Sequence, residues 1–281
     1  MNIKQLLVAV MATACLCLPS PAHAEQDKIK LAYVEWAETV ASTNVIKLVL
    51  EQAGYEVEII PVSGAVMWTS AATGDVDGFT GGWLPKTQGQ YLKRLKEQVN
   101  LLGPNLEGAR IGLAVPTYVE LDSIEDLKEN ADMFNGRIIG IDPGAGIMVN
   151  AERALKDYDL DDFELMEGSG ATMTAVLKNN VEDKKPVVVT AWSPHWKFSR
   201  WDLKYLKDPK KSFGGEEYIA TVTRLGLEDD APYAFSILKK FYWTMDECQQ
   251  VMLWGRESSP AEAAARWVKE NPDRVAEWLA Q

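Results

Sequence analysis

The sequence predicts an α/β protein built from two similar lobes. Strand-like and helix-like segments alternate twice along the chain, over residues 28–79 and again over residues 137–190. A strand–helix–strand order favours parallel strands joined by right-handed crossovers. After residue 229 the pattern is helical, which adds a helical tail to the two α/β units. Two successive units of this kind are typical of a two-lobed protein.

The first unit contains three predicted strands and two predicted helices. Alternating Ile29, Leu31 and Tyr33 predict the first strand, while Gly54 and Gly74 end the two helices. The expected elements are strands over 28–36, 55–62 and 75–79 and helices over 39–54 and 65–73, followed by a polar helix over 88–99 and an apolar strand over 110–115.

The second unit repeats this order after a helix cap at Ser123. We expect strands over 137–142, 163–166 and 186–190 and helices over 148–158 and 171–180; tail helices are expected over 231–241, 246–257, 260–270 and 271–278. The lobes should therefore comprise residues 25–115, completed by about 212–281, and residues 116–211.

The N-terminus has the features of a cleaved secretion signal over residues 1–24. Lys4 is followed by the apolar stretch Leu6 to Leu18 and by the small-x-small sequence that ends at Ala24. A lipid anchor on Cys15 is the alternative, but no leucine stands three residues before it. We expect cleavage after Ala24 and a soluble periplasmic product.

Composition narrows the range of partners. The formal net charge of −12 argues against nucleic acid and anionic lipid as partners. Cleavage of the signal leaves Cys248 as the sole cysteine, so no intramolecular disulfide is expected.

Three tryptophans share one context, at the junction between a predicted strand and a turn or helix: Trp36, Trp83 and Trp192. Core packing is the alternative role for each ring taken alone. In a two-lobed α/β protein, however, the carboxyl ends of the strands face the cleft between the lobes. Three indoles there suit a quaternary ammonium ion, which has no N–H to donate and is attracted to ring faces by roughly 0.5–2 kcal/mol per ring. The tryptophans of the tail, in contrast, are expected to pack within the core.

Several motifs carry a family resemblance that covers Lys30 to Leu279. They are Tyr33-Val34-Glu35-Trp36, Gly74-Asp75-Val76-Asp77-Gly78-Phe79, Trp83-Leu84-Pro85, Gly112-Leu113-Ala114-Val115-Pro116, Gly140-Ile141-Asp142-Pro143-Gly144-Ala145-Gly146-Ile147 and Thr190-Ala191-Trp192-Ser193-Pro194-His195-Trp196. The chain resembles the glycine-betaine/choline-type substrate-binding proteins of ABC importers. The resemblance implies a type II periplasmic-binding-protein fold that closes on its ligand in the interlobe cleft. It also implies a membrane permease as partner, no catalytic activity and no cofactor; we further expect a monomer.

The resemblance assigns roles to individual residues. Trp36, Trp83 and Trp192 would form an aromatic box around the ammonium head, and the backbone amides of Gly146 and Ile147 would hold the ligand carboxylate. Exposed amides at a helix N-terminus favour an anion, which supports that second role independently.

Two further positions bear on ligand selectivity. Gln88 replaces a histidine that some betaine binders use as a carboxylate donor, and its amide can also donate. Glu38 lies where choline binders have an acid that faces the hydroxyl, although an acid near a helix N-terminus is the simpler interpretation. The ligand therefore stays open between glycine betaine, choline, proline betaine and carnitine.

His195 is the one histidine left after signal cleavage, and it raises the question of an enzyme acting on such compounds. No nucleophile-elbow setting accompanies it, and there is no second histidine for a metal cluster. We expect His195 to pack beside Trp196 and to support the box, with no metal site. A secreted enzyme remains the remote alternative.

Overall fold

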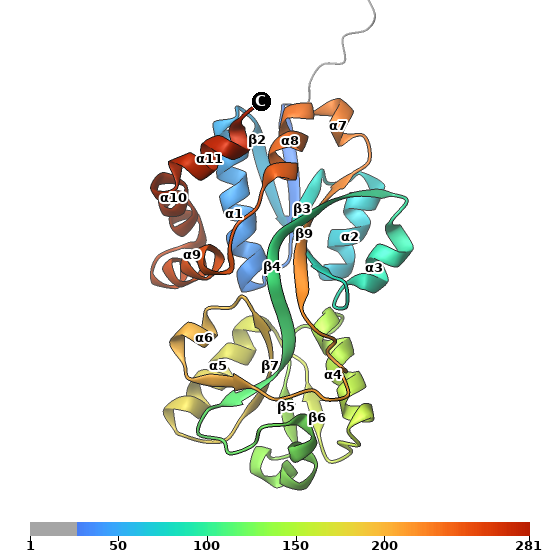
Figure 1. The fold of residues 1–281 in the computed structure, drawn as a ribbon, viewed down its shortest axis with the longest axis vertical. Coiled ribbons are helices and arrows are strands. Elements are labelled where there is room, and N and C mark those ends of the chain that lie inside the picture. The colour runs from blue at the N-terminus through green and yellow to red at the C-terminus, as the bar shows by residue number, and fades with distance from the viewer. Residues whose placement is uncertain (1–26) are drawn as a thin grey trace, which may run out of the picture.

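The computed structural model describes residues 27–281, arranged as two lobes, and one long strand runs from one lobe into the other (Figure 1). The strand order is β2-β1-β3-β9-β4-β7-β5-β6, and β8 pairs with β4. The upper lobe in Figure 1 contains β1 (Lys28–Tyr33), β2 (Glu56–Pro61), β3 (Gly78–Leu84), β9 (Glu217–Arg224) and the first part of β4 (Val99–Pro116). The lower lobe contains the rest of β4 with β5 (Arg137–Ile139), β6 (Glu164–Met166), β7 (Val188–Ser193) and β8 (Leu203–Tyr205).

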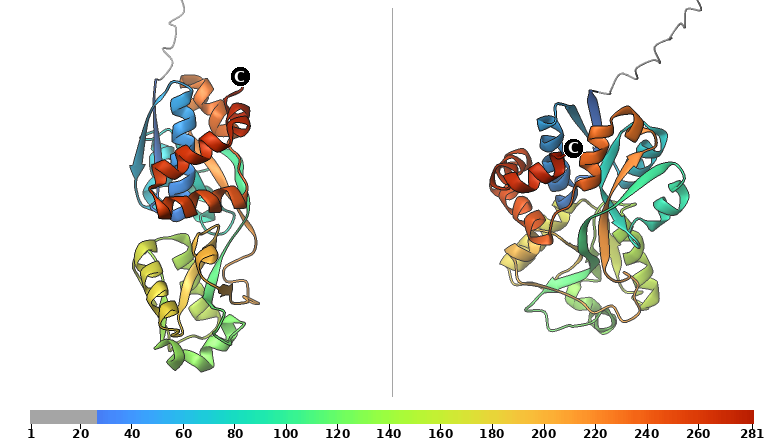
Figure 2. Two further views of the ribbon diagram at one scale, coloured as in Figure 1. Left: turned by 90° about the vertical axis from the view of Figure 1, so that its left-hand side faces the viewer. Right: turned by 45° about the horizontal axis from the view of Figure 1, so that its top comes forward.

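Helices cover the sheets of both lobes. The upper lobe carries α1 (Ala37–Gln52), α2 (Gly64–Thr73), α3 (Gly89–Leu95), α7 (Leu227–Asp230), α8 (Pro232–Lys240), α9 (Met245–Glu257), α10 (Pro260–Glu270) and α11 (Pro272–Leu279). The lower lobe carries the 3₁₀ helix η1 (Ile124–Phe134), α4 (Gly146–Asp157), α5 (Gly170–Glu182) and α6 (Lys197–Arg200). Helices α9 and α10 of the tail pack against α1, on the outside of the upper lobe (Figure 2).

Strand β4 joins the lobes, and β9 begins at the junction between them. Residues 99–109 of β4 pair antiparallel with β9, and residues 110–116 pair antiparallel with β7 and β8. Strand β9 also pairs antiparallel with β3. The predicted parallel pairing is confirmed within each lobe, for β1 with β2 and β3 and for β5 with β6 and β7. No pairing was predicted for β4 or β9; they run antiparallel to each other, β9 also to β3 and β4 also to β7, so the sheet is mixed.

Several element boundaries differ from the sequence prediction. Strand β3 covers Gly78–Leu84 instead of 75–79, and β7 covers Val188–Ser193 instead of 186–190. Trp83 and Trp192 are therefore the second-last residues of their strands, where we had expected residues just beyond a strand. The residue limits proposed above for the lobes stay a prediction.

The predicted caps and tail packing are confirmed. Gly74 ends α2 in the left-handed conformation, and Ser123 caps η1 with Asp126 completing a capping box. In the tail, the ring of Trp267 stacks on Trp278 and lies edge-on to Trp243. All three side chains are buried, so these tail tryptophans form part of the core.

Candidate functional site

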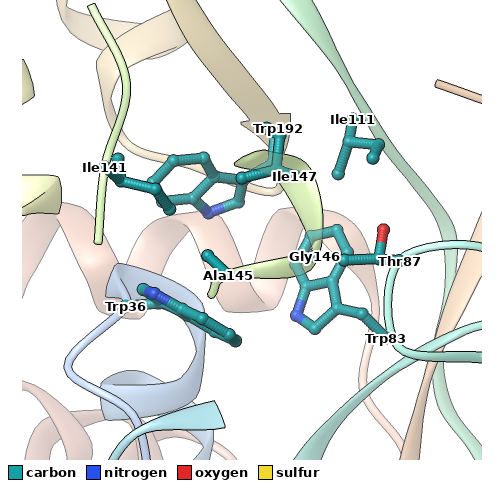
Figure 3. A pocket seen from close by; sticks show the side chains of 9 residues that line it. All are labelled: Trp36, Trp83, Thr87, Ile111, Ile141, Ala145, Gly146, Ile147 and Trp192. Atoms are coloured by element: carbon teal, nitrogen blue, oxygen red, sulfur yellow. The ribbon is translucent and has the colours of Figure 1, made fainter. Parts of the chain in front are cut away.

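The three predicted box tryptophans line one cavity between the lobes (Figure 3). The free space among its walls, open solvent at its mouth included, is about 290 Å³. Its lining residues are Trp36, Trp83, Thr87, Ile111, Ile141, Ala145, Gly146, Ile147 and Trp192. No ionised side chain belongs to this lining. The cavity therefore presents aromatic faces, aliphatic groups and the backbone at a helix N-terminus.

Trp36 and Trp83 come from the upper lobe, and both indole N–H groups are bonded to acids. Trp36 is the N-cap residue of α1, and its Nε1 donates to Asp142 Oδ1 in the lower lobe at 3.2 Å. Trp83 Nε1 donates to Glu38 Oε2 at 3.2 Å. Because these polar edges are bonded to protein groups, the two rings can offer carbon faces to a ligand.

Trp192 supplies the ring from the lower lobe, and two buried basic residues lie behind it. His195 lies edge-on to the Trp192 ring with centroids 4.7 Å apart, and its Nδ1 accepts from the amide of Lys197. Lys197 Nζ lies 3.9 Å from the Trp192 ring centroid and has no hydrogen-bond partner in the described part of the chain. Burial lowers the pKa of both side chains well below their usual values; for His195 the charges of Lys197 and Arg256 act in the same direction.

The N-terminus of α4 completes the cavity. Gly146 and Ile147 are the first two residues of this helix, and no protein group in residues 27–281 accepts from their amides. A Cβ on Gly146 would lie 2.7 Å from Thr87 Cγ2 and still closer to the Thr87 carbonyl oxygen. Glycine is thus required for this approach of α4 to the upper lobe. The two free amides are available to an anionic group in the cavity.

Glu217, the first residue of β9, holds Thr87 in place on the upper-lobe side of this contact. Its Oε1 accepts from the amides of Lys86 at 2.6 Å and Thr87 at 2.7 Å, and its Oε2 accepts from the Thr87 hydroxyl. Strand β4 changes its partner here, since Ala109 pairs with Glu217 and Arg110 with Ser193. The position of Thr87 is therefore tied to the strands that connect the lobes.

The other predicted site residues lie behind the lining. Gln88 is fully buried, and its Oε1 accepts from Trp68 Nε1 at 2.8 Å and from the amide of Trp83 at 3.2 Å. Glu38 lies behind Trp83, and burial raises the pKa of its carboxyl to about 7. His195 packs against Trp192 and Trp196, as expected.

Some lining residues were not predicted from the sequence. Thr87 follows Trp83 by four residues, and Ile141 and Ala145 belong to a motif noted above for its glycines, yet only folding brings them to one cavity with Ile111. An aliphatic side chain in a strand gives no signal that separates a cavity wall from ordinary core.

Metal binding and membrane insertion are two further points on which the described residues bear. Across residues 27–281, no three or more His, Cys, Asp or Glu side chains are grouped to hold a metal ion. In the same part of the chain, no helix combines the length and apolar character needed to cross a bilayer. The predicted signal at residues 1–24 lies outside the described residues.

Fold and cavity together define a two-lobed binding protein with its site between the lobes. Residues 27–270 match the family described as the substrate-binding domain of ABC-type glycine betaine transport systems. The chain belongs to this family. Its fold is that of the type II periplasmic binding proteins, as the resemblance implied.

Individual relatives agree with this assignment. The chain is 46% identical over 165 residues to the glycine betaine/carnitine transport binding protein GbuC of Listeria monocytogenes, a match that covers 58% of this chain and 54% of that protein. The chain thus spans about half the length of that relative. Lactococcal OpuAC, solved closed with glycine betaine, is 40% identical with a TM-score of 0.87 over 90% of this chain and all of that one. ProX of Borrelia burgdorferi is 36% identical with a TM-score of 0.88 over 90% of this chain and 97% of that one.

Proposed function

We propose that this protein captures glycine betaine, or a closely similar quaternary ammonium compound, and delivers it to the permease of an ABC importer. The observation that carries the proposal is the aromatic box of Trp36, Trp83 and Trp192 around one cavity. A methylated ammonium cannot hydrogen-bond, so ring faces are its natural partners. The lobe arrangement supports capture by closure, because the box draws rings from both lobes.

The N-terminus of α4 favours a ligand that also carries a carboxylate. The amides of Gly146 and Ile147 would bind that group while the rings hold the cation. Choline has a hydroxyl instead, which needs an acceptor, and the lining contains no carboxylate. Among the alternatives, choline is therefore less well matched than betaine, proline betaine or carnitine.

In the cell, the protein would work outside the cytoplasmic membrane as a monomer after cleavage at Ala24. The ligand would be released chemically unchanged: the one hydroxyl in the lining, that of Thr87, is donated to Glu217. Gln88, Glu38 and His195 would act behind the box and not as direct contacts.

Isothermal titration calorimetry with betaine, choline, proline betaine and carnitine tests this proposal. We expect the tightest binding for betaine and a loss of about tenfold or more when Trp36, Trp83 or Trp192 is changed to Ala. Trp254→Ala is the matched control, because Trp254 lies in α9 under Arg266 and outside the cavity lining. Unweakened binding in the three box variants would refute the box, and a ligand altered after incubation would indicate an enzyme.

A further inference from the structure

Glu38, the second residue of α1, is a buried acid without a counter-ion. Its side chain is fully buried, and its Oε2 accepts from Trp83 Nε1 and from the Thr39 hydroxyl, both at 3.2 Å. Its Oε1 has no hydrogen-bond partner, and no ion pair joins Glu38 to a base within residues 27–281. Burying a carboxyl with an unsatisfied oxygen is costly, so its place behind the site calls for a function.

Glu38 is hydrogen-bonded to a tryptophan of the box but does not line the cavity. Trp83 lines the cavity, while Glu38 meets the polar edge of the same ring. A carboxylate at that edge adds electron density to the indole and places a negative charge close behind the bound cation. The cavity lining itself is uncharged, and Glu38 and Asp142 are the two acids that accept from box indoles, Glu38 being the fully buried one of the upper lobe.

We propose that Glu38 is a specificity-determining residue, whose carboxylate makes the box select a cation over a neutral molecule of the same shape. Cation binding then releases the proton that Glu38 holds in part of the unliganded protein. This inference rests on the proposed function, because it assumes that the box binds a quaternary ammonium.

The groups around Glu38 determine how its charge responds to pH. Burial raises the pKa of Glu38 to about 7, and the nearby Ser42 hydroxyl and the hydrogen bonds from Trp83 and Thr39 oppose that rise. Cys248 of α9 also faces it, and the pKa of this thiol is raised by burial and by Glu38. Within residues 27–281, no lysine or arginine shifts the pKa of Glu38.

These contacts determine the direction in which pH changes the affinity for a cation. A bound cation stabilises the carboxylate form and so lowers the pKa of Glu38. The complex therefore holds fewer protons than the free protein near neutral pH, and binding tightens as pH rises through 7. Lys197 and His195 lie behind the opposite wall and could also contribute, so the test must separate them from Glu38.

Calorimetry on the full mature chain from about pH 5.5 to about pH 8.5 provides that test. The ligands are glycine betaine and tert-butylacetate, which replaces the ammonium nitrogen by carbon and keeps both the shape and the carboxylate. We expect betaine to bind about tenfold more tightly at the upper end and tert-butylacetate to show no such gain. Buffers of different ionisation enthalpy should report proton release with betaine alone.

Two variants test whether the pH dependence of betaine affinity comes from Glu38. Glu38→Gln keeps an oxygen acceptor for Trp83 Nε1, and we expect betaine affinity that is independent of pH and below that of the wild type at high pH. Lys197→Met should retain the pH dependence. A flat wild-type profile, an unchanged profile in Glu38→Gln, or the same profile for tert-butylacetate would overturn the proposal while leaving betaine binding intact. Absence of betaine binding at every pH would overturn the proposed function as well.

Discussion

A single methyl group at Gly146 should prevent the lobes from adopting the arrangement seen here. A Cβ on Gly146 would lie 2.7 Å from both the carbonyl carbon and Cγ2 of Thr87, and nearer still to the carbonyl oxygen. Carbon atoms in contact are about 3.5–4.0 Å apart, so the lobes would have to separate here by roughly 1 Å. Three hydrogen bonds to Glu217 hold Lys86 and Thr87, so this segment cannot easily yield.

The cost for ligand binding follows from that displacement. A shift of this size takes the amides of Gly146 and Ile147 out of hydrogen-bond range of a carboxylate held in the box. One hydrogen bond to a charged group contributes about 1.5–3 kcal/mol, so losing one or two weakens binding by roughly 100-fold. Folding should not suffer, because Gly146 begins α4 and alanine is a better helix former than glycine.

Titration calorimetry with glycine betaine and thermal unfolding without ligand measure these two effects. We expect Gly146→Ala to keep the wild-type melting temperature and to lose most of its affinity. Gly89→Ala is the matched control, since Gly89 also begins a helix, α3, and a Cβ there would meet nothing within 4 Å. If Gly146→Ala binds as tightly as Gly89→Ala, the close approach of α4 to Thr87 is not required for binding.

Two further predictions concern contacts around the box. Asp142→Ala removes the acceptor for Trp36 Nε1 across the cleft and should weaken betaine binding about tenfold by calorimetry, while Asp142→Asn should retain most of the affinity; equal losses in both would show that an acceptor is not what matters. Lys197→Met should raise the melting temperature, because burial lowers the pKa of Lys197 and the unfolded chain binds the extra proton. The stability of the wild type should therefore rise with pH up to the usual lysine pKa. The increase in melting temperature caused by Lys197→Met should then be larger at acidic than at alkaline pH, and an increase that does not change with pH would refute this.

The sequence predicts local structure where short-range signals agree. Gly54, Gly74 and Ser123 mark helix ends correctly, because caps depend on residues close in the chain. Strand–helix alternation likewise leads to the α/β lobes, and the strand-end tryptophans lead to the box, which the structure brings to one cavity.

The strands between the lobes were not predictable in the same way. The first part of β4 contains Gly103, Pro104 and Gly108, and its pairing shifts register three times, which breaks the alternation that marks a strand. Strand β9 has β-forming residues, but its partners β3 and β4 lie more than 100 residues earlier in the chain. Pairing at that distance depends on the fold and not on local pattern.

The roles of Glu38 and Gln88 show a similar limit. Both positions were candidates for ligand contact, from their spacing to Trp36 and Trp83, although an acid near a helix N-terminus was the simpler interpretation of Glu38. In the structure their side-chain oxygens bond to Trp83, through its indole Nε1 and its backbone amide respectively, and neither residue lines the cavity. Spacing places a residue near a site, but side-chain direction decides whether it forms the wall or the support.

A crystal structure with glycine betaine is the most direct test of the central claim. The account predicts the trimethylammonium group within about 6 Å of the ring centroids of Trp36, Trp83 and Trp192. It also predicts the carboxylate at the amides of Gly146 and Ile147. An ammonium group outside the three rings, or a carboxylate bound away from the α4 N-terminus, would contradict the account.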